Sequence, residues 1–407
     1  MHAERKRSVR SLLGVSLAAL LSGLFISILA VQAALDDGAG LLNVGSSGSS
    51  VPVSFHAPLP PRKVTQGIAR QVLVISVDGL RPDGITQAQA PVLMGLMERG
   101  ARAEHCETVR PSITLPSHTA MLTGLDFKNH GVVWNNYRPG HIQHPTVFSV
   151  ASEAGLSTAM LFAKDKFHFL ANPEQVHWIY GPAIPRIIPK LEDVTKPDFK
   201  ENTGPDPSGA QSASRPKAPA PAPAPALGVV PPPAGNPGAK PDALPRPPPT
   251  SKPSTSADGL ARAFAAEWPD TKYQMTFIHF GEPDGAGHGR GWMSRSYLDA
   301  VLKVDTAIGK ILDTLRDCGE LETTAIIISA DHGGLGKQHY FRQLPDTPEN
   351  VTIPWICVGP GVKAGLLITR PLRTFDTAPT ALSFLGLTPP ERLDGRAVEE
   401  VLGAQER

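Results

Sequence analysis

The stretch Ala325-Ile326-Ile327-Ile328-Ser329-Ala330-Asp331-His332-Gly333-Gly334 decides how this chain is expected to fold. Its first six residues are mostly apolar, and such a run predicts a strand that is buried on both faces. Asp331 and His332 follow directly. A carboxylate and an imidazole are unfavourable in a core unless they are paired, whereas both groups are good metal ligands. The stretch therefore predicts a buried strand whose carboxyl end carries a metal site.

Similar apolar runs recur along the chain and alternate with segments of helical periodicity. The strand-like runs are residues 72–77, 159–162, 275–280, 325–329 and 352–358, and the helical segments lie around 90–99 and 296–315. Runs that are apolar on both faces and separated by helices predict an α/β fold with a mostly parallel central sheet and helices on both faces. In such sheets, ligands bind at the carboxyl ends of the strands.

Two further aspartates follow predicted strands in the same manner. Asp78 comes directly after residues 72–77, and Asp284 lies shortly after residues 275–280. Because the carboxyl ends of parallel strands meet at one edge of a sheet, both residues are expected to converge with Asp331. For Asp78 an ordinary turn after a strand is the alternative, since Asp-Gly is common in turns.

Two histidines are candidate partners for Asp284. His288 lies four residues after Asp284, and if the segment is helical after Pro283, both side chains project to one face. His339 is the only histidine after His332, so it is the best remaining candidate for a third ligand beside this pair. An exposed loop histidine is the alternative interpretation of His339, and a glycine-rich surface loop is the alternative for the pair.

The segment Pro111-Ser112-Ile113-Thr114-Leu115-Pro116-Ser117-His118 contains a candidate nucleophile. Pro116 suits the first turn of a helix, so Thr114 is expected at a helix N-terminus, where backbone N–H groups favour anions. A free threonine hydroxyl is too weakly acidic to attack at neutral pH, but coordination to a metal would stabilise its alkoxide. Ser112 and Ser117 are the competing hydroxyls, and helix capping is the structural alternative for Thr114.

Together these motifs resemble the alkaline phosphatase superfamily, and within it the type I phosphodiesterase/nucleotide pyrophosphatase group. The resemblance extends over residues 71–401 outside a proline-rich segment. The matching stretches are Ser76-Val77-Asp78-Gly79, Thr114-Leu115-Pro116-Ser117-His118, Leu122-Thr123-Gly124-Leu125, Asn129-His130-Gly131 and Phe375-Asp376-Thr377-Ala378-Pro379-Thr380. It implies an alkaline-phosphatase-like core and two divalent metal ions, with zinc as the expected metal. Manganese or iron could fill the same kind of site.

The resemblance also implies a role for particular residues. One metal set would be Asp78, Thr114, Asp331 and His332, and the other would be Asp284, His288 and His339. Asn135 occupies the spacing of an asparagine that binds the phosphoryl oxygen in the family, with Asn136 as a competing neighbour. His339 follows His332 within seven residues, a spacing more like that of the superfamily's phosphomutases than of nucleotide pyrophosphatases.

Lys164 and Lys166 resemble the Lys-x-Lys pair of phosphonoacetate hydrolases and some threonine-type phosphomonoesterases. Two cations there would neutralise a second negative charge, which a diester lacks. The alternative is a solvated basic turn. Sulfatases of the superfamily need cysteine or serine in a C/S-x-P-x-R motif, which the segment around Thr114 lacks.

The expected function is cleavage of phosphodiester or pyrophosphate bonds in a small phosphorylated substrate, a nucleotide or another diester, through a phosphothreonine on Thr114. A phosphomonoesterase or phosphonate hydrolase that uses Lys164 and Lys166 is the first alternative. A phosphotransferase is a further alternative, and a non-catalytic envelope protein that binds through its prolines is less favoured.

The composition bears on nucleic acid as a partner and on the role of the cysteines. Lys and Arg number 39 against 38 Asp and Glu, so the chain has no charge footprint for nucleic acid. Cys106, Cys318 and Cys357 have no metal-ligand spacing, and they allow at most one disulfide.

Residues 1–34 predict export. Basic residues precede the uncharged stretch 11–34, which ends in small residues. This pattern is typical of a secretory signal, and an uncleaved membrane anchor is the alternative. Either interpretation places the rest of the chain outside the cytoplasm, as a periplasmic, secreted or anchored protein. Membrane contact is expected only through residues 11–34, if they stay uncleaved.

The remaining chain is expected to hold one catalytic domain. Residues 35–65, rich in Gly, Ser and Pro, predict a flexible tether, and residues 66–407 predict the domain. Residues 201–256 contain 17 of the 42 prolines and predict a disordered insertion within that domain, because such a segment buries too little apolar surface to order. A linker between two domains is the alternative, although neither side alone has the full ligand set.

Overall fold

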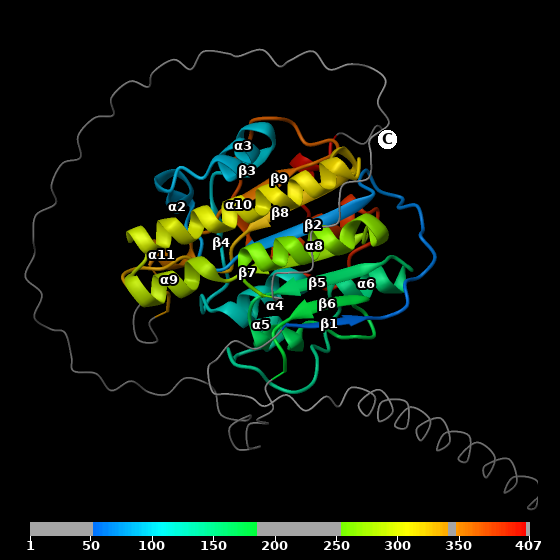
Figure 1. The fold of residues 1–407 in the computed structure, drawn as a ribbon, viewed down its shortest axis with the longest axis horizontal. Helices are drawn as coiled ribbons and strands as arrows, with labels where there is room; N and C mark the ends of the chain where they lie inside the picture. Colours follow the sequence, from blue (N-terminus) through cyan, green and yellow to red (C-terminus); the bar gives the residue numbers. More distant parts are fainter. Residues whose placement is uncertain (1–51, 185–253, 341–346, 404–407) are drawn as a thin grey trace, which may run out of the picture. The chain divides into compact units, whose positions relative to one another are not determined.

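The computed structural model describes residues 52–184, 254–340 and 347–403. Their centre is a nine-stranded sheet with the strand order β1-β6-β5-β7-β2-β8-β9-β3-β10 (Figure 1). In that order the strands are Val53–His56, Trp178–Gly181, Thr158–Phe162, Met275–Phe280, Gln71–Val77, Thr324–Ser329, Trp355–Val358, Ala101–Ala103 and Leu366–Ile368. A small second sheet pairs β4 (Cys106–Glu107) with β11 (Leu372–Arg373).

The five neighbouring strands from β6 to β8 are all parallel. Every residue of β2, β5, β7 and β8 is buried, as their apolar runs predict. Antiparallel pairs occur toward the two sides of the sheet, at β1–β6, β8–β9 and β9–β3. The predicted α/β class with a mostly parallel sheet is therefore confirmed. Strands from both sides of residues 185–253 pair directly in this sheet, because β5 neighbours β7.

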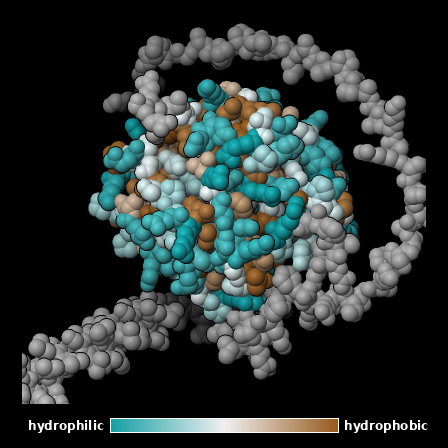
Figure 2. Space-filling view, turned by 180° about the vertical axis from the view of Figure 1, so that it is seen from behind, coloured by the Kyte–Doolittle hydropathy of each residue, from teal (hydrophilic) through white to brown (hydrophobic). Residues whose placement is uncertain are grey.

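Helices cover both faces of the sheet (Figure 1). On one face α10 contacts its neighbours α2, α3, α8 and α9, and on the other α12 contacts α4 and α6. The bounds of the first group are α2 Pro82–Gln87, α3 Pro91–Arg99, α8 Ala257–Thr271, α9 Glu282–Arg290 and α10 Arg295–Asp317. Those of the second group are α4 Thr114–Thr123, α6 Val147–Glu153 and α12 Thr377–Phe384, and the short α5 and α11 span Phe127–His130 and Pro348–Val351. Figure 2 shows the molecule from behind, where hydrophilic side chains surround scattered hydrophobic ones.

Helix α10 illustrates how the sequence builds the helical layer. It begins after Ser294, whose side chain accepts a hydrogen bond from the N–H of Tyr297. Its buried residues recur every three or four positions from Tyr297 to Leu315. One face of the helix is therefore buried along its whole length, as the predicted helix around 296–315 requires.

Two of the predicted segment boundaries differ from the structure. The predicted tether, residues 35–65, includes Val53–His56, which pair with β6 as strand β1. The tether prediction is therefore wrong for these four residues. The last residue of the predicted insertion, Ser256, is the N-cap of α8, because its side chain accepts a hydrogen bond from the Gly259 N–H. The end of the insertion is therefore ordered as part of the helix. Most of the insertion, the rest of the tether up to residue 51 and the predicted signal, residues 1–34, lie outside the described residues.

Two further observations concern the cysteines and membrane contact. Cys106, Cys318 and Cys357 are all free thiols. Within residues 52–184, 254–340 and 347–403, no helix has both the length and the apolar character needed to cross a bilayer.

Candidate metal centre and active site

Three aspartates meet at the carboxyl ends of β2, β7 and β8. Asp78 directly follows β2, Asp284 lies in the first turn of α9 after β7, and Asp331 follows β8. The Asp284 N–H donates to the Asp78 carbonyl at 3.0 Å, and the Gly79 N–H donates to Asp331 Oδ1 at 3.1 Å. Asp78 and Asp331 are fully buried and Asp284 is 6% exposed. The predicted convergence of the three carboxylates is thus present, and hydrogen bonds hold their loops together.

Four buried ligand atoms at this edge have no hydrogen-bond partner among the residues that the structure describes. They are Asp78 Oδ1, Asp284 Oδ1, Asp331 Oδ2 and His332 Nε2. His332 Nε2 lies 3.3 Å from Asp331 Oδ2 and 3.5 Å from Asp78 Oδ1. A buried polar atom without a partner costs about 1–3 kcal/mol, so such a group needs an explanation. Oxygen and imidazole nitrogen atoms that face one another fit a divalent cation.

The ligand atoms form two adjoining groups. Those of Asp284, His288 and His339 lie within 4.8 Å of one another, and so do those of Asp78, Asp284 and His332. Because α9 is helical from Glu282, Asp284 and His288 share a face, and Asp284 Oδ1 lies 3.3 Å from His288 Nε2. The rings of His332 and His339 stack with centroids 3.7 Å apart, which brings the two groups together.

The three histidines are oriented in the same way. Each places Nδ1 against a backbone carbonyl oxygen: His288 on Lys337 at 3.0 Å, His332 on Gly333 at 2.9 Å, and His339 on Ser112 at 2.7 Å. A carbonyl only accepts, so Nδ1 carries the proton and the lone pair of Nε2 is left for a metal. Burial lowers the pKa of His332, and burial with repulsion from His332 lowers the pKa of His339 to about 3. Both rings are therefore neutral, as a metal ligand must be.

The carboxylates have very different proton affinities. Burial raises the pKa of Asp78, but the nearby Lys164 ammonium and the His279 hydrogen bond outweigh it and hold that pKa well below its usual range. Burial and the Asp78 charge raise the pKa of Asp331 well above its usual range. Lys164 Nζ donates to Asp78 Oδ2 at 2.6 Å and to Asp284 Oδ2 at 2.7 Å. The structure thus places this predicted substrate-binding lysine on the predicted ligands.

Thr114 is the first residue of α4, so the prediction of a helix start at this position is confirmed. Ile113 is the N-cap residue and makes no side-chain cap, so Thr114 does not cap the helix. The residue is 1% exposed. His118, one turn later, places Nδ1 2.8 Å from the Thr114 carbonyl oxygen and 3.6 Å from Asp331 Oδ2. The start of α4 therefore lies beside the carboxylate cluster.

The competing hydroxyls have other partners. Ser112 Oγ donates to the carbonyl oxygen of His339 at 2.7 Å, which joins the segment before α4 to the loop after β8. Ser117 Oγ accepts from the hydroxyl of Thr108 at 3.0 Å within the core. The arrangement favours Thr114 over both serines as the nucleophile.

Asn135 lies over the start of α4. Its Oδ1 accepts from the Leu115 N–H at 2.9 Å and from Lys166 Nζ at 3.0 Å. Burial, together with the nearby Lys164 charge, lowers the pKa of Lys166 to about 8. Of the two predicted lysines, Lys166 is thus the one that contacts the predicted phosphoryl-binding asparagine.

One residue of the centre, His279, has no counterpart among the predicted site residues. It lies near the end of β7, with Nε2 2.9 Å from Asp78 Oδ2. The Ala163 N–H donates to its Nδ1 at 3.3 Å, so the proton of the neutral ring sits on Nε2 and donates to Asp78. A histidine inside the otherwise mostly apolar strand Met275–Phe280 is the signal that could have revealed it, because a buried imidazole needs a partner.

Trp292 and Tyr297 support the turn after Asp78. The indole N–H and the tyrosine hydroxyl both donate to the Gly79 carbonyl oxygen, at 2.9 and 3.0 Å. Space for the indole comes from Gly287 and Gly334, because a Cβ at either position would approach its ring to 2.6 or 2.2 Å. Of the glycines around Asp284, Gly287 thus serves the packing of Trp292.

A matched pair of substitutions in α9 tests this packing. Gly287→Ala should lower the free energy of unfolding by about 1–3 kcal/mol, because the new methyl group overpacks against Trp292. Gly285→Ala in the same helix should raise it by about 0.5–1 kcal/mol, since a Cβ there meets nothing within 4 Å and alanine favours the helix. Urea unfolding measures both. Equal shifts in the same direction would contradict the role given to Gly287.

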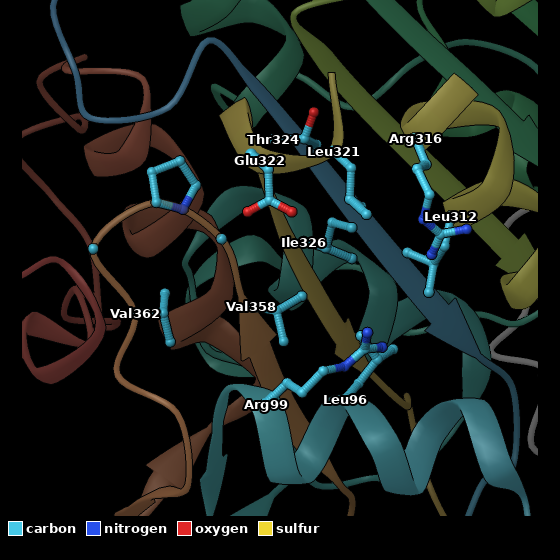
Figure 3. A pocket seen from close by; sticks show the side chains of 13 residues that line it. Leu96, Arg99, Leu312, Arg316, Leu321, Glu322, Thr324, Ile326, Val358 and Val362 are labelled. Atoms are coloured by element: carbon cyan, nitrogen blue, oxygen red, sulfur yellow. The ribbon is translucent and has the colours of Figure 1, made fainter. Parts of the chain in front are cut away.

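The structure also contains a cavity of about 390 Å³ away from this centre (Figure 3). Its lining includes Thr324 and Ile326 from the beginning of β8, and Val358 from the end of the antiparallel β9. It therefore lies at the opposite edge of the sheet from Asp331, and it contributes nothing to the metal centre.

Comparison with known families identifies the class of protein. The sequence model of the family described as type I phosphodiesterase / nucleotide pyrophosphatase matches residues 72–339. The matched region begins in β2 and ends at His339, so it contains the whole candidate centre. The fold and site define a member of the alkaline phosphatase superfamily. Within it, the chain belongs to the type I phosphodiesterase / nucleotide pyrophosphatase family.

Curated relatives match over shorter stretches. Human arylsulfatase K is 31% identical over 100 residues, which are 24% of this chain and 19% of that protein. An N-acetylglucosamine-6-O-sulfatase of Bacteroides thetaiotaomicron is 36% identical over 110 residues, 26% of this chain and 20% of that protein. The multifunctional alkaline phosphatase superfamily protein PehA of Trinickia caryophylli is 28% identical over 148 residues, 33% of this chain and 29% of that protein. The chain thus spans less than a third of these relatives.

Solved structures share the fold at low sequence identity. Murine ectonucleotide pyrophosphatase/phosphodiesterase 5 aligns with a TM-score of 0.52 and 13% identity over 80% of this chain and 97% of that chain. A phosphonate monoester hydrolase from Silicibacter pomeroyi aligns with a TM-score of 0.50 and 19% identity over 81% of this chain and 76% of that chain. These likenesses establish an alkaline-phosphatase-like core.

Proposed function

We propose that this chain is an exported, metal-dependent hydrolase of phosphodiester or pyrophosphate bonds that forms a phosphothreonine on Thr114. The observation that carries the proposal is the group of four buried, unpartnered ligand atoms beside the N-terminus of α4. Membership of the type I phosphodiesterase / nucleotide pyrophosphatase family supports the reaction class. A small phosphorylated molecule is the proposed substrate, and the N-terminal segment supports export.

The centre has the ligands for two divalent cations. The first set would be Asp78, Thr114, Asp331 and His332, and the second would be Asp284, His288 and His339. When bound, the two ions supply positive charge that favours the threonine alkoxide and neutralises phosphoryl oxygens. Nitrogen and carboxylate ligands suit zinc, which is the metal we propose.

The chain's own residues account for the two chemical steps. In the first, Thr114 Oγ1 loses its proton to solvent and attacks phosphorus, and the bond from phosphorus to the leaving oxygen breaks as the new Oγ1–P bond forms. The leaving group departs as an anion, which takes up a proton from solvent when its basicity requires one. In the second, water attacks the phosphothreonine, the Oγ1–P bond breaks and Thr114 regains a proton. The positive end of the α4 helix dipole and the amide NH2 group of Asn135 favour the negative charge that develops on phosphoryl oxygens.

A comparison of three chromogenic esters tests this function. The zinc-loaded protein should hydrolyse bis-p-nitrophenyl phosphate faster than p-nitrophenyl phosphate, because a diester needs no second cation at the site. It should also prefer the diester to p-nitrophenyl sulfate, because the segment around Thr114 lacks the C/S-x-P-x-R motif of sulfatases. A chelator should abolish the activity and added zinc should restore it, since the buried carboxylates then regain their cations. A preference for the sulfate ester, in line with the sulfatase relatives, would contradict the proposal.

Phosphomonoester hydrolysis is a second candidate because Lys166 contacts Asn135. A monoester carries a second negative charge, which the ammonium 3.0 Å from Asn135 Oδ1 can meet. Lys166→Ala should therefore lower kcat/KM for p-nitrophenyl phosphate about 10–100-fold, and by a much smaller factor for the diester. Lys303→Ala is the control on the exposed surface. Equal losses for both esters would exclude this role of Lys166.

The same contact predicts a pH dependence. Lys166 has a pKa lowered to about 8 by burial and by Lys164, so its charge is present below that pH and is lost as the pH rises through it. Activity on the monoester relative to the diester should therefore fall above about pH 8. Lys166→Ala should remove this decline. A monoester-to-diester ratio that stays constant from pH 7 to 9.5 would contradict it.

A further inference from the structure

The side chain of Lys164 joins the two proposed metal-ligand sets. Its ammonium lies 2.6 Å from Asp78 Oδ2 and 2.7 Å from Asp284 Oδ2, and these carboxylates belong to different sets. The Lys164 side chain is 23% exposed, while those of Asp78 and Asp284 are 0% and 8% exposed. Solvent therefore screens the interaction only weakly.

The backbone at Lys164 is held in place by the neighbouring strands β5 and β7. The residue follows the end of β5 and precedes the short 3₁₀ helix Asp165–Phe169. The preceding residue, Ala163, donates its N–H to His279 of β7. His279 in turn donates to the same Asp78 Oδ2 that accepts from Lys164. Lys164 is thus part of one connected network with the carboxylates.

We propose that Lys164 is an internal counter-ion that positions the two carboxylates before metals bind and lowers the affinity of the centre for metal. This inference rests on the metal centre proposed above. Three buried carboxylates, Asp78, Asp284 and Asp331, repel one another, and an uncompensated buried charge is strongly destabilising. The Lys164 ammonium, in contact with two of them, offsets part of that repulsion.

The hydrogen bonds show how the positioning works. Lys164 donates hydrogen bonds to Oδ2 of Asp78 and to Oδ2 of Asp284. Among the described residues, Oδ1 of each carboxylate has no hydrogen-bond partner. Each carboxylate is thereby held with one oxygen on the lysine and the other available to a cation. Second-layer partners of this kind orient the ligands of a metal.

The same charge opposes the metals. A divalent cation held by Oδ1 of either carboxylate would have the same sign of charge as the Lys164 ammonium, which bonds Oδ2 of the same carboxylate, and like charges repel. Lys164 therefore stabilises the metal-free centre more than the loaded centre. By thermodynamic linkage, a group that favours the metal-free state lowers the apparent affinity for metal.

Removing the charge should have two effects of opposite direction. In Lys164→Met, the metal-free protein should melt several degrees lower than the wild type, because the carboxylates are left uncompensated. Lys164→Met should also bind zinc more tightly than the wild type, with a Kd that is lower by about tenfold or more when measured by competition with a fluorescent chelator. Lys166→Met, which removes a neighbouring charge that contacts Asn135, should change the Kd by less than about threefold.

The outcomes separate this inference from the proposed function. A Kd for zinc in Lys164→Met that is unchanged or higher than in the wild type would overturn the counter-ion role. If Lys164→Met does not fold without metal, Lys164→Gln purified with zinc keeps the test open, because its zinc should pass to the chelator less readily than that of the wild type. Absence of zinc binding by the wild type would instead overturn the metal centre itself.

Discussion

Thr114→Ala should lower kcat on the preferred phosphate ester by about 10⁴–10⁶-fold while the protein keeps its fold and most of its zinc. The large effect is expected because the covalent step has no other hydroxyl at the start of α4 to replace it. Ser112 donates to the His339 carbonyl oxygen, and Ser117 accepts from Thr108 in the core. Steady-state kinetics, circular dichroism and metal analysis of the purified variant check the three parts of this result.

Ser117→Ala is the matched control for Thr114→Ala. It removes a buried hydroxyl from the same helix, and should lower stability by about 1 kcal/mol with little change in kcat. Trapping of a labelled phosphoryl group on the wild type, but not on Thr114→Ala, would add direct support for the intermediate. Activity in Thr114→Ala close to that of the wild type would exclude a phosphothreonine mechanism.

His332→Ala should weaken zinc binding by at least about 100-fold and lower activity at limiting zinc by a similar factor. His332 is fully buried, and within the described part of the chain its Nε2 has no hydrogen-bond partner, although it faces Asp78 and Asp331. Without the imidazole, the first ligand set loses one of its four metal ligands, and the deleted side chain leaves a cavity beside the others. Zinc content after dialysis and a chelator titration measure the loss.

His177→Ala provides the control for the loss of an imidazole. His177 bonds to Thr158 at the beginning of β5, on the opposite edge of the sheet from the centre. This variant should bind zinc as the wild type does. The assignment of His332 as a ligand would be wrong if both variants retained full zinc content.

The sequence predicted the central strands closely because their residues are apolar on both faces. Strands β2, β7 and β8 agree with the predicted runs to within one residue at either end. The parallel order of these strands then places Asp78, Asp284 and Asp331 at one edge without further information. The helical spacing of Asp284 and His288, and the helix start at Thr114, are likewise local features that the chain order reveals.

The strands at the sides of the sheet were predicted less well. Strand β1 has only four residues, Val53–His56, so its short alternation of apolar and polar side chains did not mark it. All four residues are exposed, and the strand exists through its pairing with β6. The predicted run 352–358 is shortened to Trp355–Val358, since Pro354 has no N–H to donate to a neighbouring strand. That β9 runs antiparallel to β8 also depends on the path of the chain between them.

By itself, the sequence determined the fold class and brought an acidic, histidine-rich centre and a threonine to one edge of the sheet. Only the tertiary structure decided which atom of each ligand faces the centre, that His279 supports Asp78, and that Lys164 sits on the carboxylates while Lys166 sits on Asn135. The physical reason is the separation along the chain between the residues that interact. Burial and chain direction follow from neighbouring residues, whereas the contact between Gly79 and Asp331 joins positions 252 residues apart, and partners at such separations are selected only when the strands pack.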